Sequence, residues 1–120
     1  MKEVKAYIRH LMVNRVIEAL EQKGFSDMTL IDVRGITRGL SGEEYQYSLE
    51  LAEKYMNMIK LEIVCNDAQA EKAVQIITKT ARTGRKGDGL VFVTPVEEVV
   101  RIKTGEKGKA ALQPGDQGTK

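Results

Sequence analysis

The chain has 120 residues, of which 42% are hydrophobic and 30% charged, and its formal net charge is only +2. This length suits a single domain with a modest core. The balanced charge and the few aromatic residues give no case for nucleic-acid binding. No apolar run approaches a membrane span, the N-terminus does not resemble a signal peptide, and the single cysteine, Cys65, excludes an internal disulfide. We expect a cytoplasmic domain over residues 1–112 and a flexible polar tail at 113–120.

In three segments, successive side chains are expected to point alternately to the two faces of a sheet. This pattern predicts half-buried strands at 2–9, 28–36 and 57–65. The residues expected to share a face are Val4, Ala6 and Ile8 in the first, Thr29, Ile31 and Val33 in the second, and Ile59, Leu61 and Ile63 in the third. Two further strands are predicted near the C-terminus, from Leu90 to Thr94 and, after Pro95, from Val100 to Lys103.

Two helices are predicted between these strands. Asn14 is placed to cap the first, which ends at Gly24. Asn66 or Asp67 is placed to cap the second. The apolar stripe of the second helix consists of Ala73, Val74, Ile77 and Ala81.

The order strand, helix, strand, strand, helix, strand predicts an α+β fold of the ferredoxin-like βαββαβ type, with two helices on one face of an antiparallel sheet. The uncovered face carries apolar as well as charged residues, which suits burial against other subunits. The connection at 37–55 is much longer than a hairpin loop. Such a loop is either functional or a plain disordered insertion.

The run from Thr83 to Gly89 follows the second predicted helix and contains three glycines in six residues. Arg82, Arg85 and Lys86 make its surroundings positive. Backbone N–H groups together with cations suit a phosphate or another anion. The alternative is a helix C-cap followed by a turn that leads into a strand, since neither a P-loop nor a dinucleotide fingerprint is present.

Candidate catalytic groups are few. His10 is the only histidine, and Cys65 ends an apolar run, as a small buried hydrophobe does. The acidic residues of the long loop are not spaced for acid–base chemistry. We therefore expect a binding and signalling protein with no catalytic residues, no metal site and no catalytic cofactor.

Three runs resemble the signature of the PII signal transduction proteins, namely Thr83–Gly89, Phe92–Glu98 and Arg101–Glu106. The resemblance extends from about residue 1 to about residue 112. It implies a homotrimer that holds an adenine nucleotide, ADP, AMP or ATP, in each cleft between subunits. It also implies that the segment 37–55 is the family's T-loop, which would engage a membrane transporter or a metabolic enzyme.

The resemblance also implies roles for individual residues. Adenine would contact one set of residues on the second and third strands, and two further nucleotide-binding residues would lie at the base of the T-loop. The glycine-rich turn would offer backbone N–H groups to the phosphates, and two cations would reach the phosphates from the neighbouring chain. In that order, the residues are Met28, Thr29, Glu62 and Val64; Gly35 and Arg38; Gly87, Asp88 and Gly89; and Arg101 and Lys103.

Several positions depart from the family pattern. Leu90 replaces a lysine that contacts phosphate, so we expect weaker ATP binding and better competition by ADP or AMP. Gly39 replaces a glutamine that helps to hold magnesium and 2-oxoglutarate, and Met58 replaces a lysine that pairs with 2-oxoglutarate. These changes argue against magnesium and 2-oxoglutarate. They leave Gly39, Ser41 and Met58 as a second-effector region that bicarbonate could occupy.

The T-loop tip departs as well. Leu51 and Leu49 stand where relatives carry a modified tyrosine or serine, so covalent modification is not expected. Two alternatives to a divergent nucleotide sensor stay open. One is a nitrogen regulator that has kept 2-oxoglutarate sensing, and the other is a structural trimer that binds nothing in its clefts.

Overall fold

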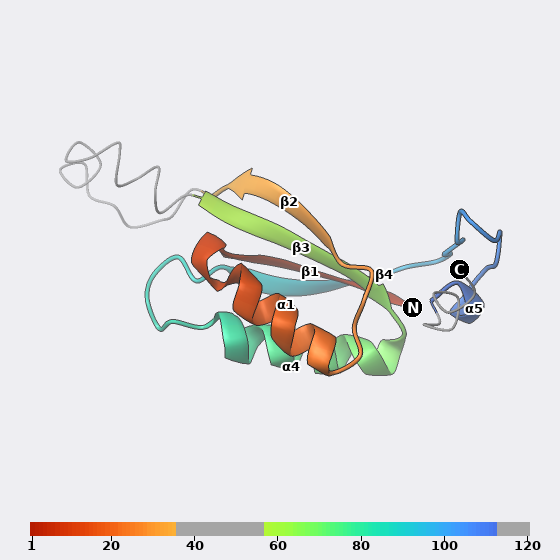
Figure 1. Ribbon diagram of the computed structural model, residues 1–120, viewed down its shortest axis with the longest axis horizontal. Helices are drawn as coiled ribbons and strands as arrows, with labels where there is room; N and C mark the ends of the chain where they lie inside the picture. Colours follow the sequence, from red (N-terminus) through yellow and green to blue (C-terminus); the bar gives the residue numbers. More distant parts are fainter. Residues whose placement is uncertain (36–56, 113–120) are drawn as a thin grey trace.

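The computed structural model describes residues 1–35 and 57–112 (Figure 1). Its elements are β1 (Lys2–Arg9), the 3-10 helix η1 (His10–Met12), α1 (Val13–Gln22), β2 (Thr29–Arg34), β3 (Asn57–Cys65), α4 (Asp67–Ala81), β4 (Leu90–Pro95) and α5 (Lys109–Leu112). The predicted T-loop at 37–55, with Arg38, Gly39 and Ser41, and the predicted tail at 113–120 lie outside the described residues.

The four strands form one antiparallel sheet in the order β2-β3-β1-β4. Helices α1 and α4 lie side by side on the same face of this sheet (Figure 1). This chain order, with β1 placed between β3 and β4, is that of the ferredoxin-like fold. The predicted α+β ferredoxin-like class is therefore confirmed.

The core lies between the sheet and these two helices. In β1 every second side chain points into it, so that Val4, Ala6 and Ile8 are at most 1% exposed. These three pair across the sheet with Ile63, Leu61 and Ile59 of β3. The helices contribute Val16, Leu20, Ala73 and Ile77. Burying one large aliphatic side chain of this kind stabilises the fold by about 1.5–3 kcal/mol, so the alternation in β1 and β3 determines which face the helices cover.

Helix α1 begins earlier than predicted. Its N-cap residue is Met12, whose side chain makes no capping hydrogen bond, and η1 already turns the chain ahead of it. Asn14 is an exposed residue of the first helical turn, so its predicted capping role is wrong. The predicted end at Gly24 is confirmed, since its φ is +89°. Gly24 N donates to Glu21 O at 3.0 Å and Phe25 N donates to Leu20 O at 3.1 Å, which is the pattern of a Schellman motif.

Helix α4 begins with a capping box. The Asn66 side chain accepts from Gln69 N at 2.8 Å, and the Gln69 side chain accepts from Asn66 N at 3.4 Å, so Asn66 is the cap of the two candidates. Asp67 instead pairs with the N-terminal amino group at 3.0 Å, and that hydrogen bond lowers its pKa. Within residues 1–35 and 57–112, no helix is both long and apolar enough to cross a membrane.

The predicted last strand, from Val100 to Lys103, does not form. Its place is taken by a tight turn, in which Arg101 N donates to Glu106 O at 2.8 Å and Gly105 N donates to Arg101 O at 2.7 Å. Only an isolated bridge between Val100 and Lys107 has strand character there. Gly105, with φ +76°, permits this turn, and the unpredicted helix α5 follows it.

Candidate functional site

A groove of about 450 Å³ lies where the end of β3 meets the segment after β4. We call it the Arg101 groove. Five of the eleven residues that the sequence places around a nucleotide line it, and they come from β2, β3 and the turn after β4. These are Thr29, Glu62, Val64, Arg101 and Lys103. The structure therefore brings together the predicted adenine-contacting residues and the two predicted phosphate-contacting cations, with the exception of Met28, which packs against the core.

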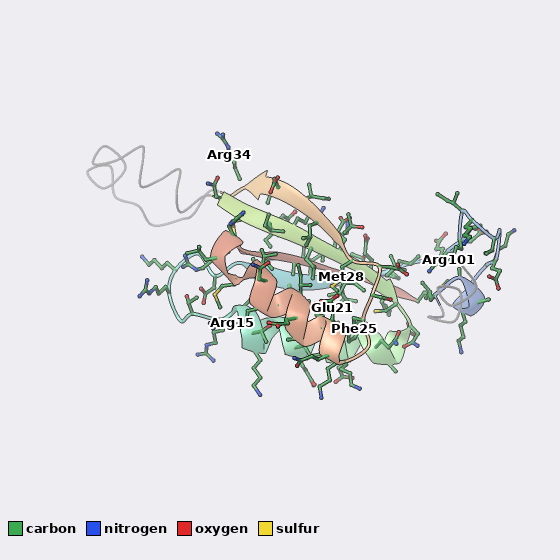
Figure 2. All side chains as sticks on the ribbon, viewed as in Figure 1. Arg15, Glu21, Phe25, Met28, Arg34 and Arg101 are labelled. Atoms are coloured by element: carbon green, nitrogen blue, oxygen red, sulfur yellow. The ribbon has the colours of Figure 1, made fainter. Side chains whose placement is uncertain are left out.

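Arg101 is held in place within this groove. Its Nε donates to Ala111 O of α5 at 2.7 Å, and its Nη2 lies 3.2 Å from Asp27 Oδ2. Figure 2 shows Arg101 beside α5, at the end of the molecule opposite Arg34. Helix α5 thus gives the guanidinium a fixed anchor, and Asp27 gives it a counter-charge.

Two acidic residues of the groove pair with lysines that do not line it. Lys60 Nζ lies 3.1 Å from Glu62 Oε2, and Lys5 Nζ lies 3.3 Å from Glu3 Oε1. The hydrogen bond to Glu62 raises the pKa of Lys60. Both lysines also lie over aromatic rings of the uncovered sheet face, Lys60 over Tyr7 and Lys5 over Phe92.

The glycine-rich turn, residues 83–89, is organised around the Asp88 carboxylate. Oδ2 accepts from Thr83 N and Gly84 N, each at 2.9 Å, and Oδ1 accepts from Arg9 Nε at 2.9 Å and from the Thr83 hydroxyl. Burial alone would raise the pKa of Asp88, but the hydrogen bonds from Thr83, Arg9 and Gly84 outweigh it and hold the pKa well below its usual range. Asp88 is therefore a carboxylate at neutral pH.

Arg9 closes the same turn from the end of β1. Besides its bond to Asp88, its Nη2 donates to the carbonyl oxygen of Lys86. The turn thus has a fixed backbone, while the side chains of Arg85 and Lys86 remain exposed beside it. A rigid glycine turn with exposed cations is suited to an anion, because little order has to be imposed on binding.

Met58 lies between this turn and the base of the long loop. It is 7% exposed. A Cβ on Gly35 would lie 2.8 Å from Met58 Sδ, and one on Gly89 would lie 3.0 Å from Met58 Cε. Gly89 also approaches the β1 backbone so closely that its Cβ would lie 1.7 Å from Tyr7 O. Gly35, Met58 and Gly89 therefore form one packed cluster at this end of the sheet.

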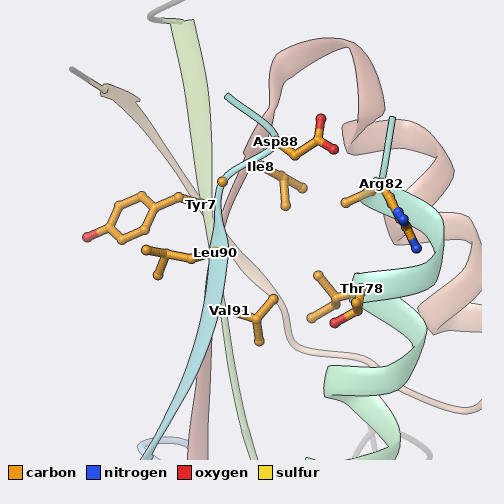
Figure 3. Close-up of a pocket in the computed structure, with 10 residues that line it drawn as sticks. Tyr7, Ile8, Thr78, Arg82, Asp88, Leu90 and Val91 are labelled. Atoms are coloured by element: carbon orange, nitrogen blue, oxygen red, sulfur yellow. The ribbon is translucent and has the colours of Figure 1, made fainter. Parts of the chain in front are cut away.

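A smaller pocket of about 180 Å³ opens behind the turn, between β4 and α4. Figure 3 shows Ile8 and Val91 pointing toward α4, while Tyr7 and Leu90 point to the opposite side of the sheet. Leu90, which replaces the family's phosphate-contacting lysine, is 58% exposed on that uncovered face.

The predicted site residues thus fall into two groups at opposite ends of the sheet. Thr29 begins β2 and Gly35 directly follows its last residue, so the two are six positions apart, which corresponds to about 20 Å of extended chain. Glu62 and Met58 are four positions apart along β3, or about 13 Å. Within one chain, a nucleotide cannot contact the Arg101 groove and the glycine turn in the way that the sequence predicts.

Metal-ligating side chains and the thiol of Cys65 are the remaining candidates for chemistry. In the part of the chain that the structure describes, no three His, Cys, Asp or Glu side chains gather in a way that could hold a metal ion. The Cys65 side chain is 3% exposed, and burial raises the pKa of its thiol. A buried thiol of raised pKa is a poor nucleophile.

Comparison with known proteins agrees with this architecture. The family described as "Nitrogen regulatory protein P-II" matches residues 1–106. The chain is 40% identical over 112 residues to "Nitrogen regulatory protein P-II" of Azospirillum brasilense, covering 93% of this chain and 100% of that protein. It is 42% identical over 118 residues to "Nitrogen regulatory protein P-II 2" of Methanothermobacter thermautotrophicus, covering 93% and 97%.

A ferredoxin-like domain with a long connection between β2 and β3 is the class that the structure defines. The chain belongs to the nitrogen regulatory protein P-II family of signal transduction proteins, as the resemblance of its glycine turn predicted. Another relative of the chain is "Nitrogen regulatory protein P-II" of Nostoc punctiforme, which is 40% identical to it over 112 residues.

Proposed function

We propose that this protein is a signalling trimer that binds an adenine nucleotide, ADP, AMP or ATP, in clefts between neighbouring copies. The observation that carries the proposal is the separation of the two groups of residues. The Arg101 groove and the glycine turn lie at opposite ends of one sheet, but each has the chemistry of part of a nucleotide site. A second copy that docks with its glycine turn against the first copy's Arg101 groove would complete the site.

The uncovered sheet face supports such an assembly. Tyr7 and Phe92 stack on it with ring centroids 6.1 Å apart, and Leu90 and Ile31 are 58% and 40% exposed there. Apolar and aromatic groups of this kind on an open sheet are typical of a surface that other subunits cover. A closed ring of three copies would bury three such faces at once.

The ligand would signal through the base of the loop at 37–55. Gly35 precedes this loop, Asn57 follows it, and Met58 connects the loop base to Gly89 of the glycine turn. An anion bound at the turn would therefore act on the loop base through this packed side chain. By this route nucleotide occupancy would bias the loop between states that engage or release a membrane transporter or a metabolic enzyme in the cytoplasm.

Complementation between two inactive variants tests the proposal. Arg101→Ala disables the groove, and Gly87→Ala, at a position with φ +90°, distorts the turn. Each variant alone should bind ADP weakly. After the two are unfolded and refolded together in equal amounts, about a quarter of the clefts should have both halves intact and bind ADP normally. If the refolded mixture does not regain ADP binding while both variants remain trimeric, the site is not shared between copies.

A nitrogen regulator that senses 2-oxoglutarate is the second candidate, and the relatives, which are named as nitrogen regulatory proteins, favour its role in nitrogen regulation. The sequence opposes it, since Gly39 offers no side-chain ligand and Met58 offers no charge. Tighter ATP binding in the presence of 2-oxoglutarate and magnesium would establish this second candidate. If 2-oxoglutarate has no effect and bicarbonate changes nucleotide affinity, the protein is a sensor linked to carbon uptake.

A further inference from the structure

Asp27 has an unusual backbone conformation next to the Arg101 groove. It is the one non-glycine residue with positive φ, at +58°, among those that the structure describes. It lies in the short connection between α1, which ends at Gln22, and β2, which begins at Thr29. Aspartate tolerates this left-handed conformation better than most residues, but glycine adopts it without strain. An outlier of this kind at a ligand groove is a reason to ask what its side chain does.

The side chain of Asp27 is directed at the groove's own arginine. Its Oδ2 lies 3.2 Å from Arg101 Nη2, and the carboxylate side chain is 53% exposed while the arginine side chain is 26% exposed. Glu62 and Glu3, the other acidic residues that line the groove, instead pair with Lys60 and Lys5. Among these three acids, Asp27 is therefore the one that forms an ion pair with a cation of the groove.

We propose that Asp27 is a specificity residue that occupies the Arg101 guanidinium as an internal anion and so penalises highly charged ligands of the groove. The inference rests on the proposed nucleotide site. A phosphate that reaches Arg101 must share the guanidinium with Asp27 or displace it, and it meets a fixed negative charge in either case. The penalty grows with ligand charge, so it is greatest for ATP, smaller for ADP and AMP, and absent for uncharged adenosine.

The carboxylate could instead help binding by holding Arg101 in position. Arg101 has a second anchor, however, since its Nε donates to Ala111 O at 2.7 Å. Removal of Asp27 should therefore leave the guanidinium near its present place. The two roles predict opposite signs for the effect of neutralising Asp27, which makes them separable.

The test is calorimetry with adenosine, AMP, ADP and ATP on the wild type, on Asp27→Asn and on Asp27→Gly. Asparagine keeps the size of the side chain and tolerates the left-handed backbone, and glycine provides a second variant that suits this backbone even if the first folds poorly. Glu71→Gln is the matched control, because Glu71 is exposed on α4 and the change in net charge is the same.

Asp27→Asn and Asp27→Gly should both bind ATP about tenfold more tightly than the wild type and AMP about twofold more tightly, and their affinity for adenosine should be unchanged. Glu71→Gln should change none of the four by as much as about twofold. The gain for ATP should shrink at high salt, because it is electrostatic.

The outcomes distinguish this inference from the proposed function. If the wild type binds nucleotides but neutralising Asp27 weakens ATP, or changes all four ligands equally, Asp27 is not a charge-selective residue and the inference fails alone. If neither the wild type nor either variant binds any nucleotide, the proposed function fails and takes the inference with it. Binding of ATP by the variants and not by the wild type would support both.

Discussion

Arg9 and Asp88, 79 positions apart in the chain, meet with Nε 2.9 Å from Oδ1 and join the end of β1 to the glycine turn. The pair is largely shielded from solvent, with side chains 17% and 23% exposed. The same guanidinium also contacts the carbonyl of Lys86. The conformation of the turn therefore depends on a residue that belongs to the central sheet.

Replacing Arg9 should destabilise the protein through this turn. Arg9→Ala removes a charge-assisted hydrogen bond and leaves Asp88 with one partner fewer, so the free energy of unfolding should fall by about 1–3 kcal/mol. Urea denaturation at a fixed protein concentration measures it. The control is Arg15→Ala, an exposed residue of α1, which should change stability by less than about 0.5 kcal/mol. Equal effects of the two substitutions would show that the Arg9–Asp88 pair contributes nothing.

The pKa of Asp88 predicts a pH dependence of stability. Its folded-state pKa lies well below the ordinary value, so the unfolded chain binds the proton more readily. The stabilisation from Asp88 is thus fully present above about pH 5 and is lost as the pH falls below about 4. The difference in the free energy of unfolding between the wild type and Asp88→Asn should be largest near neutral pH and should shrink steadily as the pH falls from about 5 toward about 2. Denaturation curves that stay a constant distance apart over that range would be inconsistent with the low pKa.

Two glycines of the turn should respond very differently to alanine. Gly84 and Gly89 both have positive φ, +83° and +93°. A Cβ on Gly84 meets nothing within 4 Å, whereas a Cβ on Gly89 would lie 1.7 Å from the backbone oxygen of Tyr7. Gly84→Ala should cost about 1 kcal/mol of strain, and Gly89→Ala should cost more than about 3 kcal/mol because strand backbone has to move. Similar melting temperatures for the two variants would contradict the close approach of Gly89 to β1.

Cys65 should be unreactive in the folded protein. Its side chain is 3% exposed, and burial raises the pKa of the thiol, so little thiolate is available at neutral pH. A maleimide or iodoacetamide reagent should modify Cys65 at least about a hundredfold more slowly in buffer than in denaturant. Modification at equal rates would show that the end of β3 opens readily.

Much of the fold could be predicted from local pattern. The alternation in β1 and β3 and the glycine that ends α1 are determined by nearby residues, and all three appear in the structure as expected. The errors arose where local signals compete. Asn14 is a good cap in isolation, but the chain is already turning at His10. The segment from Val100 to Lys103 has a strand-like alternation, but it forms a turn with one isolated bridge, from Val100 to Lys107.

The candidate site was harder to predict. The glycine turn was recognised from its glycines and neighbouring cations, and the residues of the Arg101 groove were identified through the family resemblance. Their separation to opposite ends of the sheet depends on the tertiary structure, and no local sequence pattern contains it. Arg9 and Asp27 were missed altogether. The local sequence indicates only that Arg9 is the last polar residue of a strand and that Asp27 is a loop aspartate. Their importance lies in partners 79 and 74 positions away along the chain.

The most direct test of the central claim is calorimetric titration of the protein and of Arg101→Ala with ADP. The account predicts that the wild type binds one ADP per chain and that Arg101→Ala, still trimeric, binds it about tenfold to a hundredfold more weakly, since a charge-assisted contact to phosphate is lost. Equal affinity in the two proteins, or no binding by the trimeric wild type, would contradict a nucleotide site in the Arg101 groove.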